Sequence, residues 1–417
     1  MKLVLVATGR RIAPFDDPVG EMPAGTGTLA AHQRAVAEAT GLTMAAAPSL
    51  EELDTGGEPA WVMMDDLFVS LRLARHWLPA ARAAGRPAVV TLPSSRFLEL
   101  YGQHQDLRFH DDGSASYRAW WLPGGCRRGE APALTAAALP VRPPFRERAI
   151  RFPVPRNILG RDEVVHPLTT TVALHLRHWV HVLWLANLWP QIELVERITR
   201  TPLSTAWRLL RSLRPGVAAT KWAAARSFNY VARGVSIHPT ACVEFSVLGE
   251  GCRVGPFALV RGAVLGHNVC VEERANICYS VLGDGDFVSK NSTVFACLGF
   301  PDADLCINGM QYCVAGRNSA LTSLVRPMDM KYRDDVTVRM DGKTARIREL
   351  MVGSCFGHRS FVGPEVLIAP GREIPNGAVV APRPGSVLTR VDPNVGADVP
   401  SCVVDGVLVP MTGRGEG

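Results

Sequence analysis

Lysine is scarce in this sequence. Of the 45 basic residues only five are lysines, so arginine carries almost all of the positive charge. A net charge of +6 dominated by guanidinium groups is compatible with anion recognition. However, aromatic residues make up only 7% of the chain, few of them lie near basic clusters, and no zinc-finger spacing occurs. The sequence therefore does not favour a nucleic-acid-binding protein.

Long uninterrupted hydrophobic runs are also missing. The N-terminal apolar run is too short for a signal-peptide core and predicts a buried strand. The one longer apolar stretch, residues 172–189, contains three histidines and Arg177, which argues against a membrane span. CxxC pairs are absent, and nine of the ten cysteines lie between Cys242 and Cys402. They are interpreted as small buried residues in a reducing compartment, and we expect a cytoplasmic protein.

A repeat of 17 residues dominates the C-terminal half. Three aliphatic positions recur in each repeat about six residues apart, and small residues such as Ala258 and Ala275 recur between them. A six-residue period cannot come from a helix, and it is typical of a triangular coil whose aliphatic residues point to the axis. The pattern predicts a left-handed parallel β-helix with stacked parallel strands. The aligned sets are Val231, Leu248, Leu265, Leu282; Ile237, Val254, Val271, Val288; and Val243, Val260, Ile277, Val294.

The repeat predicts the domain organisation. It returns with Phe356, Val362, Ile368, Ile374 and Val380, whereas residues 299–350 depart from it. Within them, Asp341-Gly342 predicts a hairpin turn. An excursion of this length usually lines a binding site, although a capping insertion remains an alternative. The expected parts are an α/β domain (1–150), a helical connector (151–230), β-helix coils (231–298), the excursion (299–350), and further coils with a C-terminal tail (351–410).

The N-terminal half alternates strand-like and helix-like segments, which predicts an α/β layer with a mostly parallel sheet. The strand-like runs are 3–7, 61–64 and 88–92, and the helix-like runs are 29–39 and 71–84. Together with the loop 7–14, which reads Ala-Thr-Gly-Arg-Arg-Ile-Ala-Pro, this arrangement resembles the sugar-nucleotidyltransferase family, many members of which carry hexapeptide tails.

The resemblance implies a nucleotide site with possible Mg²⁺. Gly9, Arg10 and Arg11 correspond to the family's glycine-rich loop, and Asp65 and Asp66 follow the strand whose terminal aspartate binds Mg²⁺. A strand-end turn with a helix cap is the alternative for the two aspartates. The family's lysine after the loop is missing, because no lysine occurs between Lys2 and Lys221. We therefore expect a degenerate domain that binds a nucleotide sugar, and a sugar-1-phosphate nucleotidyltransferase is an alternative.

Residues 169–228 show helical periodicity, which Pro190 and Pro202 are expected to divide into two or three helices. Seven basic residues and no acidic residue occur between Arg197 and Arg226, which predicts a basic face that could contact an anionic membrane surface or a substrate phosphate, or simply face solvent. The spacing of His175, His178 and His181 does not favour a metal site, because the three would fan across the helix and no carboxylate or cysteine lies among them.

Hexapeptide β-helices resemble a family dominated by CoA-dependent acyltransferases, which are commonly homotrimers and use a histidine as general base. Residues 274–284 resemble the coil that carries this histidine in the bifunctional uridyltransferase/acetyltransferases, but Ile277 stands in its place. His358 is the first candidate for a replacement base and His267 the second. The γ-class carbonic anhydrases are not favoured, because the histidine spacing is wrong.

We therefore expect a homotrimeric transferase that uses acetyl-CoA or another acyl-CoA and acts on a nucleotide sugar or glycan precursor. A catalytically inactive binding protein or a structural and regulatory scaffold is the alternative from another class.

Overall fold

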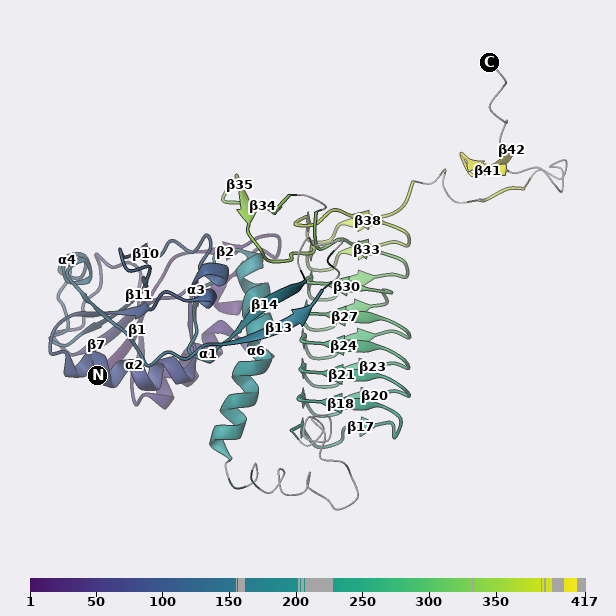
Figure 1. Ribbon diagram of the computed structural model, residues 1–417. Helices are drawn as coiled ribbons and strands as arrows, with labels where there is room; N and C mark the ends of the chain where they lie inside the picture. The colour runs from purple at the N-terminus through teal and green to yellow at the C-terminus, as the bar shows by residue number, and fades with distance from the viewer. Residues whose placement is uncertain are drawn as a thin grey trace.

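The computed structural model describes most of the chain, and Figure 1 shows its arrangement. An N-terminal α/β domain lies beside a stack of short parallel strands, and the long helix α6 (Trp179–Arg200) stands between them (Figure 1). The described residues are 1–154, 162–201, 228–331, 334–383, 388–391 and 401–410, together with Arg156, Leu203, Ala206 and Gly385.

The N-terminal domain is built on a mixed sheet with the strand order β6-β1-β7-β11-β9-β12. Neighbouring strands are parallel except that β11 is antiparallel to both β7 and β9, and the short β10 pairs with β11. The predicted α/β layer is thus confirmed, with one inserted antiparallel strand. The bounds are β6 Thr43–Ala47, β1 Lys2–Val6, β7 Ala60–Met64, β11 Ala115–Leu122, β9 Ala88–Leu92, β12 Leu139–Val141 and β10 Arg108–Phe109.

Helices cover both faces of this sheet, which explains why β7 and β9 are buried along their whole length. Successive residues of β1 enter different cores: Leu3 packs with the face that carries α1, α2 and α3, and Val4 packs with the face that carries α4. Side-chain caps set the starts of α1 and α2, because Thr28 and Ser70 accept hydrogen bonds from backbone N–H groups of the first turn. The helices are α1 Leu29–Ala39, α2 Leu71–Ala83, α3 Arg96–Tyr101 and α4 Ala131–Ala136.

Small two-stranded ribbons complete the domain. Two of them are local turns of the chain after β1, and a third joins the segment after β7 to the segment that precedes α6. The fourth is a longer hairpin between the domain and the strand stack (Figure 1). They pair β2 (Arg11–Ile12) with β3 (Asp17–Pro18), β4 (Pro23–Ala24) with β5 (Gly27–Thr28), β8 (Leu67–Val69) with β15 (Ala173–His175), and β13 (Arg148–Pro153) with β14 (Glu163–Leu168); a 3₁₀ turn spans Val19–Glu21.

The connector differs from its prediction in two ways. Its first part forms β13, β14 and β15, not helix, and α6 continues through Pro190 without ending there. Proline removes one backbone hydrogen bond, but apolar residues on both sides of Pro190 pack into one core and hold the helix in place. Residues 202, 204, 205 and 207–227 of the predicted basic helices lie outside the described residues.

The C-terminal half is a parallel β-helix. Two sheets of eight strands and one of five run along the stack, with a further two-strand ladder beside it. Every aligned aliphatic position is paired as the repeat predicts, for example Val254 with Val271 and Val271 with Val288. These inward residues form one continuous core in which Ile237, Ile374 and Val380 are half-buried at the ends, and Val231 of the first coil is 47% exposed. The register predicted from the sequence is therefore confirmed.

The strands are very short, mostly two or three residues each. The first sheet, which we call the domain-facing sheet, contains β16 (Tyr230–Val231), β19 (Val247–Leu248), β22 (Val264–Leu265), β25 (Val281–Leu282), β28 (Leu298–Gly299), β31 (Val314–Ala315), β36 (Cys355–Phe356) and β39 (Glu373–Ile374). The second contains β17 (Ser236–Ile237), β20 (Arg253–Val254), β23 (Cys270–Val271), β26 (Phe287–Val288), β29 (Asp304–Leu305), β32 (Ala320–Leu321), β37 (Phe361–Val362) and β40 (Val379–Val380). The third contains β18 (Cys242–Glu244), β21 (Leu259–Arg261), β24 (Asn276–Cys278), β27 (Thr293–Phe295) and β30 (Met310–Gln311), and the added ladder pairs β33 (Arg326–Pro327) with β38 (Leu367–Ile368).

The excursion is shorter than the sequence pattern predicts. The coils continue through β33, and only the following segment leaves the stack, as the antiparallel hairpin β34 (Val336–Met340) and β35 (Lys343–Ile347). The pattern broke at residue 299 because a glycine replaces the inward aliphatic residue of β28. A Cβ at Gly299 would lie 2.0 Å from the carboxylate of the fully buried Asp286, which fills that space. The predicted turn at Asp341-Gly342 is confirmed, since both residues have positive φ between β34 and β35.

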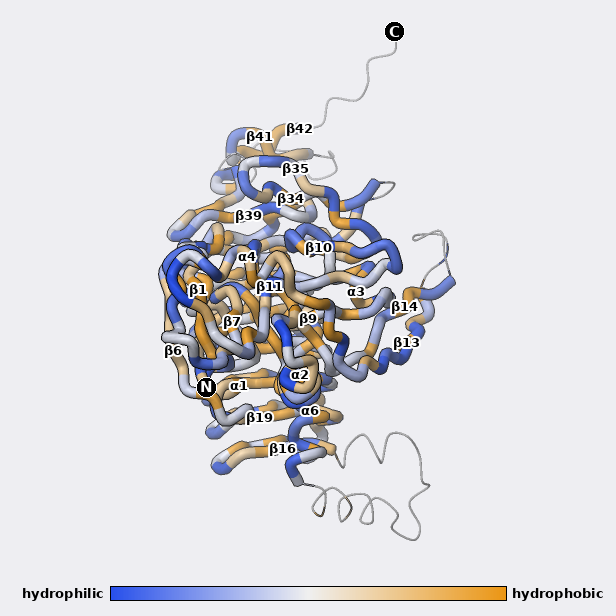
Figure 2. Tube along the Cα trace, turned by 90° about the vertical axis from the view of Figure 1, so that its left-hand side faces the viewer, coloured by the Kyte–Doolittle hydropathy of each residue, from blue (hydrophilic) through white to orange (hydrophobic). Residues whose placement is uncertain are grey.

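One hydrophobic core joins the N-terminal domain, α6 and the strand stack. Outward residues of the domain-facing sheet, including Val264 and Val281, are buried together with α6 and with one face of the N-terminal sheet. In Figure 2 hydrophobic residues follow the strands of the N-terminal sheet and the strands stacked behind it. No helix among the described residues is long and apolar enough to cross a membrane. A last hairpin, β41 (Ser401–Val404) and β42 (Val407–Pro410), follows the stack.

Candidate functional site

A polar cavity of about 310 Å³ lies at the carboxyl edge of the N-terminal sheet. The segments that line it directly follow β1, β6 and β7, and further residues come from β11 and the chain before α6. Strand β1 lies between β6 and β7. The chain passes from β1 to β6 on one side of it and then to β7 on the other side, so the strand order reverses at β1. Ligands of open α/β sheets bind in the crevice at such a reversal, which makes this cavity the leading candidate site.

The loop after β1 is held by the first aspartate after β7. Asp65 Oδ1 accepts hydrogen bonds from the backbone N–H of Thr8 (3.0 Å) and from its hydroxyl (2.6 Å). Burial raises the pKa of the Asp65 carboxyl, and the Thr8 bonds oppose this shift. Gly9 has φ +63°, a conformation that favours glycine, and it turns the chain so that Arg10 faces the cavity.

Asp66 and His175 form a buried pair in the wall of the cavity. Asp66 Oδ1 lies 2.7 Å from His175 Nδ1, and His175 Nε2 accepts a hydrogen bond from the backbone N–H of Arg118 (3.3 Å). Burial raises the pKa of the Asp66 carboxyl, but His175, Arg10 and Arg118 together outweigh burial and hold this pKa below its usual value. Both imidazole nitrogens of His175 therefore have hydrogen-bond partners within the protein, and neither is directed at a ligand. The Asp66 and His175 pair holds the neighbouring residues in position.

Three guanidinium groups meet in the cavity. Arg10, Arg118 and Arg177 line it, together with the carboxylates of Glu51, Asp66 and Asp106 and other polar groups. Arg10 Nε is buried without a hydrogen-bond partner among the described residues and lies 4.0 Å from Asp66 Oδ2. The lining therefore offers donors for phosphate oxygens and acceptors for hydroxyl groups in one small space.

The sequence-predicted nucleotide residues are only partly brought together here. Arg10 and Asp66 line the cavity, and Asp65 and Gly9 shape the loop behind it. Arg11 does not line the cavity, because its side chain pairs with the exposed Asp16 at 2.9 Å. No described group of three or more histidine, cysteine, aspartate or glutamate side chains has the geometry of a metal site.

Arg118 and Arg177 were not predicted as site residues. Arg118 is the one charged residue of strand β11, and Arg177 interrupts the apolar stretch before α6. In the sequence, each of them was marked only by being a charged residue within a mostly apolar segment. The predicted histidine trio is also separated in the structure, because His175 lies on β15, His178 caps α6 and His181 lies inside the helix.

His358, the first predicted general base, is buried at the contact between the strand stack and the N-terminal domain. Its Nε2 lies 2.9 Å from Asp17 Oδ2, and its Nδ1 accepts a hydrogen bond from the backbone N–H of Arg317 (2.8 Å). Arg317 also donates to Asp17 (2.9 Å), and the His358 ring packs against Phe15. Burial lowers the pKa of His358, which Asp17 partly offsets. We call Asp17, Arg317 and His358 the corner clamp.

His267, the second predicted base, occupies the equivalent corner in an earlier coil. Its Nδ1 accepts from the backbone N–H of Glu250 (3.1 Å), as that of His358 accepts from Arg317, and each histidine follows a glycine. An Nδ1 acceptor places the proton of the neutral ring on Nε2, so the exposed nitrogen of His267 is a donor and not a base. His267 does line a separate cavity of about 390 Å³ beside α6.

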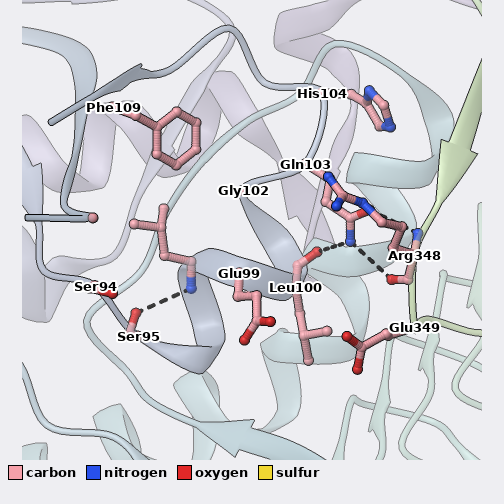
Figure 3. A pocket seen from close by; sticks show the side chains of 12 residues that line it. Ser94, Ser95, Glu99, Leu100, Gly102, Gln103, His104, Phe109, Arg348 and Glu349 are labelled. Atoms are coloured by element: carbon pink, nitrogen blue, oxygen red, sulfur yellow. Dashed lines mark hydrogen bonds between the residues drawn. The ribbon is translucent and has the colours of Figure 1, made fainter. Parts of the chain in front are cut away.

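A further cavity, of about 420 Å³, lies where the inserted hairpin returns to the stack (Figure 3). There the side-chain amide of Gln103 donates to the carbonyl of Arg348 (3.1 Å), and the Arg348 N–H donates back to Gln103 Oε1 (2.9 Å). His104 Nε2 lies 2.8 Å from the carbonyl of Arg346, and Arg96 pairs with Glu349. This cavity borders contacts that dock the hairpin on the N-terminal domain.

Comparison with known proteins adds no relative. No protein-family model matches the chain, and no curated protein is significantly similar to it. The fold and the cavities described above therefore carry the functional argument.

Proposed function

We propose that this protein binds a nucleotide sugar, or a related sugar phosphate, in the cavity at the carboxyl edge of its N-terminal sheet. The convergence of Arg10, Arg118 and Arg177 in that cavity is the observation that carries the proposal. Guanidinium groups present paired N–H donors that match phosphate oxygens. The carboxylates in the same lining accept hydrogen bonds from hydroxyl groups, as a sugar requires, whereas a purely basic lining would fit a bare phosphate equally well.

The proposal includes two structural claims that come from the sequence. The N-terminal domain is a degenerate relative of the sugar nucleotidyltransferases, supported by the loop after β1 and by the aspartates after β7. The coils are left-handed, supported by aliphatic residues every six positions with small residues between them. The missing lysine favours binding over nucleotidyl transfer, since no compact ammonium charge is available to the phosphates near the loop.

The donor set does not fit Mg²⁺ well. Asp65 Oδ1 already accepts two hydrogen bonds from Thr8, and Asp66 Oδ1 is bonded to His175. Mg²⁺ demands near-octahedral oxygen ligands, which these committed carboxylates do not offer. In the proposed function the arginines hold the phosphates, and no step depends on a metal ion.

Acyl transfer from acetyl-CoA stays a prediction. It requires a base with a free lone pair near the acceptor, and the neutral tautomers inferred for His267 and His358 do not provide one. Binding by the N-terminal cavity does not depend on that reaction. A protein that binds a nucleotide sugar without transferring an acyl group would match the observed geometry.

A thermal-shift series tests the proposal. Nucleotide sugars, nucleoside triphosphates and acetyl-CoA are each added to the purified protein, and a ligand present at 100 times its Kd stabilises the folded state by about 2.7 kcal/mol. We expect nucleotide sugars to raise the melting temperature and Arg118→Gln to abolish the rise. Arg128→Gln, which removes an exposed arginine paired with Glu52, is the matched control and should respond as the unaltered protein does. Equal shifts in both variants, or no shift at all, would refute the proposal.

A further inference from the structure

The inserted hairpin places a carboxylate against the candidate site. Asp341, at the tip between β34 and β35, lies 3.6 Å from Arg10 Nη1 and 3.8 Å from Arg177 Nη2. Arg10 and Arg177 lie 167 residues apart in the sequence, yet one side chain of the inserted hairpin bridges them. The excursion is thus part of the environment of the cavity.

The geometry points to Asp341 as a built-in competitor for the anionic part of the ligand. We propose that its carboxylate occupies the position of a phosphate group between Arg10 and Arg177, and that phosphate binding displaces the hairpin tip. This inference rests on the proposed function, because it assigns a regulatory contact to the same cavity. Phosphate and carboxylate oxygens compete for the same guanidinium N–H groups, and their like charges disfavour joint occupancy.

The contacts are weak enough to be exchanged. The Asp341 side chain is 62% exposed, and both distances are near the upper limit for an ion pair. Solvent screens such pairs strongly, so they contribute little to stability. Arg177 has a second partner in Asp106 at 3.4 Å, and Arg10 also contacts the carbonyl of Arg177 at 3.5 Å. Loss of Asp341 therefore leaves both arginines held in the cavity.

The base of the hairpin is fixed more firmly than its tip. Arg372 donates to the carbonyl of Thr337 (2.9 Å) near the start of β34, and His178 Nε2 lies 3.1 Å from the carbonyl of Arg339, two residues before Asp341. On the other strand, the Gln103 and Arg348 pair of Figure 3 ties the hairpin to the domain. Because these contacts hold the hairpin as far as Arg339, only the turn that carries Asp341 needs to move to release its carboxylate, and the hairpin stays on the domain.

Inorganic diphosphate is the probe for the test, with calorimetric titration of the full chain at constant ionic strength. We expect Asp341→Asn to tighten diphosphate binding by about three- to tenfold, the effect of removing two exposed ion pairs. Asp334→Asn removes the same charge at the base of the same excursion and serves as the matched control, with an expected change of less than twofold. An Asp341→Asn protein that binds diphosphate more weakly, or no more tightly than the control, overturns the inference.

Hydrogen exchange separates displacement from a mere change of charge. If diphosphate displaces the tip, amide exchange in residues 341–343 of the unaltered protein should rise on binding, and it should not rise in Asp341→Asn. Slower exchange at the tip on binding would overturn the inference even if affinities change as expected. If neither the unaltered protein nor either variant binds diphosphate, the proposed function fails and the inference fails with it. Binding without an Asp341 effect refutes the inference alone.

Discussion

Single inward residues of the coils carry much of the stability of the strand stack. Val271 on β23 is 1% exposed and pairs in register with Val254 and Val288. Val271→Asp would bury an unpaired charge, which is expected to lower the free energy of unfolding by about 3–5 kcal/mol. Cys270→Asp changes the adjacent residue, which points out of the coil, and should cost far less. Urea unfolding of both variants checks this, and equal midpoints would mean that the facing assigned to the strand is wrong.

Buried histidines make the stability of the protein depend on pH. His32 stacks on Phe68 at 4.5 Å, its Nε2 lies 2.8 Å from the carbonyl of Val69, and burial lowers its pKa from 6.5 to about 4. Between these values the unfolded chain binds a proton that the folded chain excludes. Stability is therefore full above pH 6.5 and is lost as the pH falls toward 4, by about 3 kcal/mol for this residue.

Unfolding experiments from pH 7 to pH 4 test the contribution of His32. His32→Phe should reduce the loss of stability over this range, while His76→Phe, at an exposed position on α2, should leave it nearly unchanged. Burial also lowers the pKa of His166 to about 4 and that of His181 well below its usual value, so part of the loss must remain in every variant. A profile that His32→Phe does not flatten would contradict the assignment.

At the scale of elements, the corner clamp ties β3, through Asp17, to the strand stack. If His358 acted only as a general base at the surface, His358→Ala would abolish acyl transfer and leave the melting temperature nearly unchanged. The burial of His358 between Asp17 and Arg317 changes the expectation for stability: the substitution leaves buried partners unsatisfied and should cost about 1–3 kcal/mol. His238→Ala, at an exposed corner, is the control. Calorimetric melting that is equal for the two variants would refute a structural role for the clamp.

The regular coils could be predicted from sequence because each turn repeats the same inward positions. The coil that starts at β28 was not predicted, because Gly299 and Ala315 replace aliphatic residues at inward positions. The spacing from Val294 to its partner Met310 is also one residue shorter than the repeat of 17. The α/β elements were recognisable from their periodicity. Their sheet order, with β11 inserted antiparallel, was not, because periodicity reports which face is buried and not which strand is adjacent.

The candidate site could be predicted only where its residues are local in sequence. Arg10 and Asp66 follow strands that the pattern identified, so their position at a strand end was foreseeable. Arg118, Arg177 and Asp341 reach the cavity through strand order, the start of α6 and the docking of the hairpin. These are tertiary arrangements, and no local motif marks them.

At the scale of the whole molecule, the domain-facing sheet restricts how copies of the chain can associate. Its outward residues are buried under α6 and the N-terminal domain. The predicted homotrimer, if it forms, must therefore use the other two faces of the stack. Exposed apolar side chains occur at or beside the second sheet, including Phe257, Phe361 and Val379. Oligomeric state itself stays a prediction.

A core shared by all three parts predicts that they unfold together. Val281 on β25 is fully buried although it points out of the coil, because α6 and the N-terminal domain cover it. An interface of this kind couples domains that would otherwise melt separately. We expect a single calorimetric transition whose van't Hoff enthalpy matches the measured enthalpy.

Val281→Glu places a charge in the interface and should split the transition in two, with the strand stack melting later since its own core is intact. Arg253→Glu, at an exposed outward position of the second sheet, should preserve one transition. Two transitions in the unaltered protein would show that the shared core does not couple the domain to the stack.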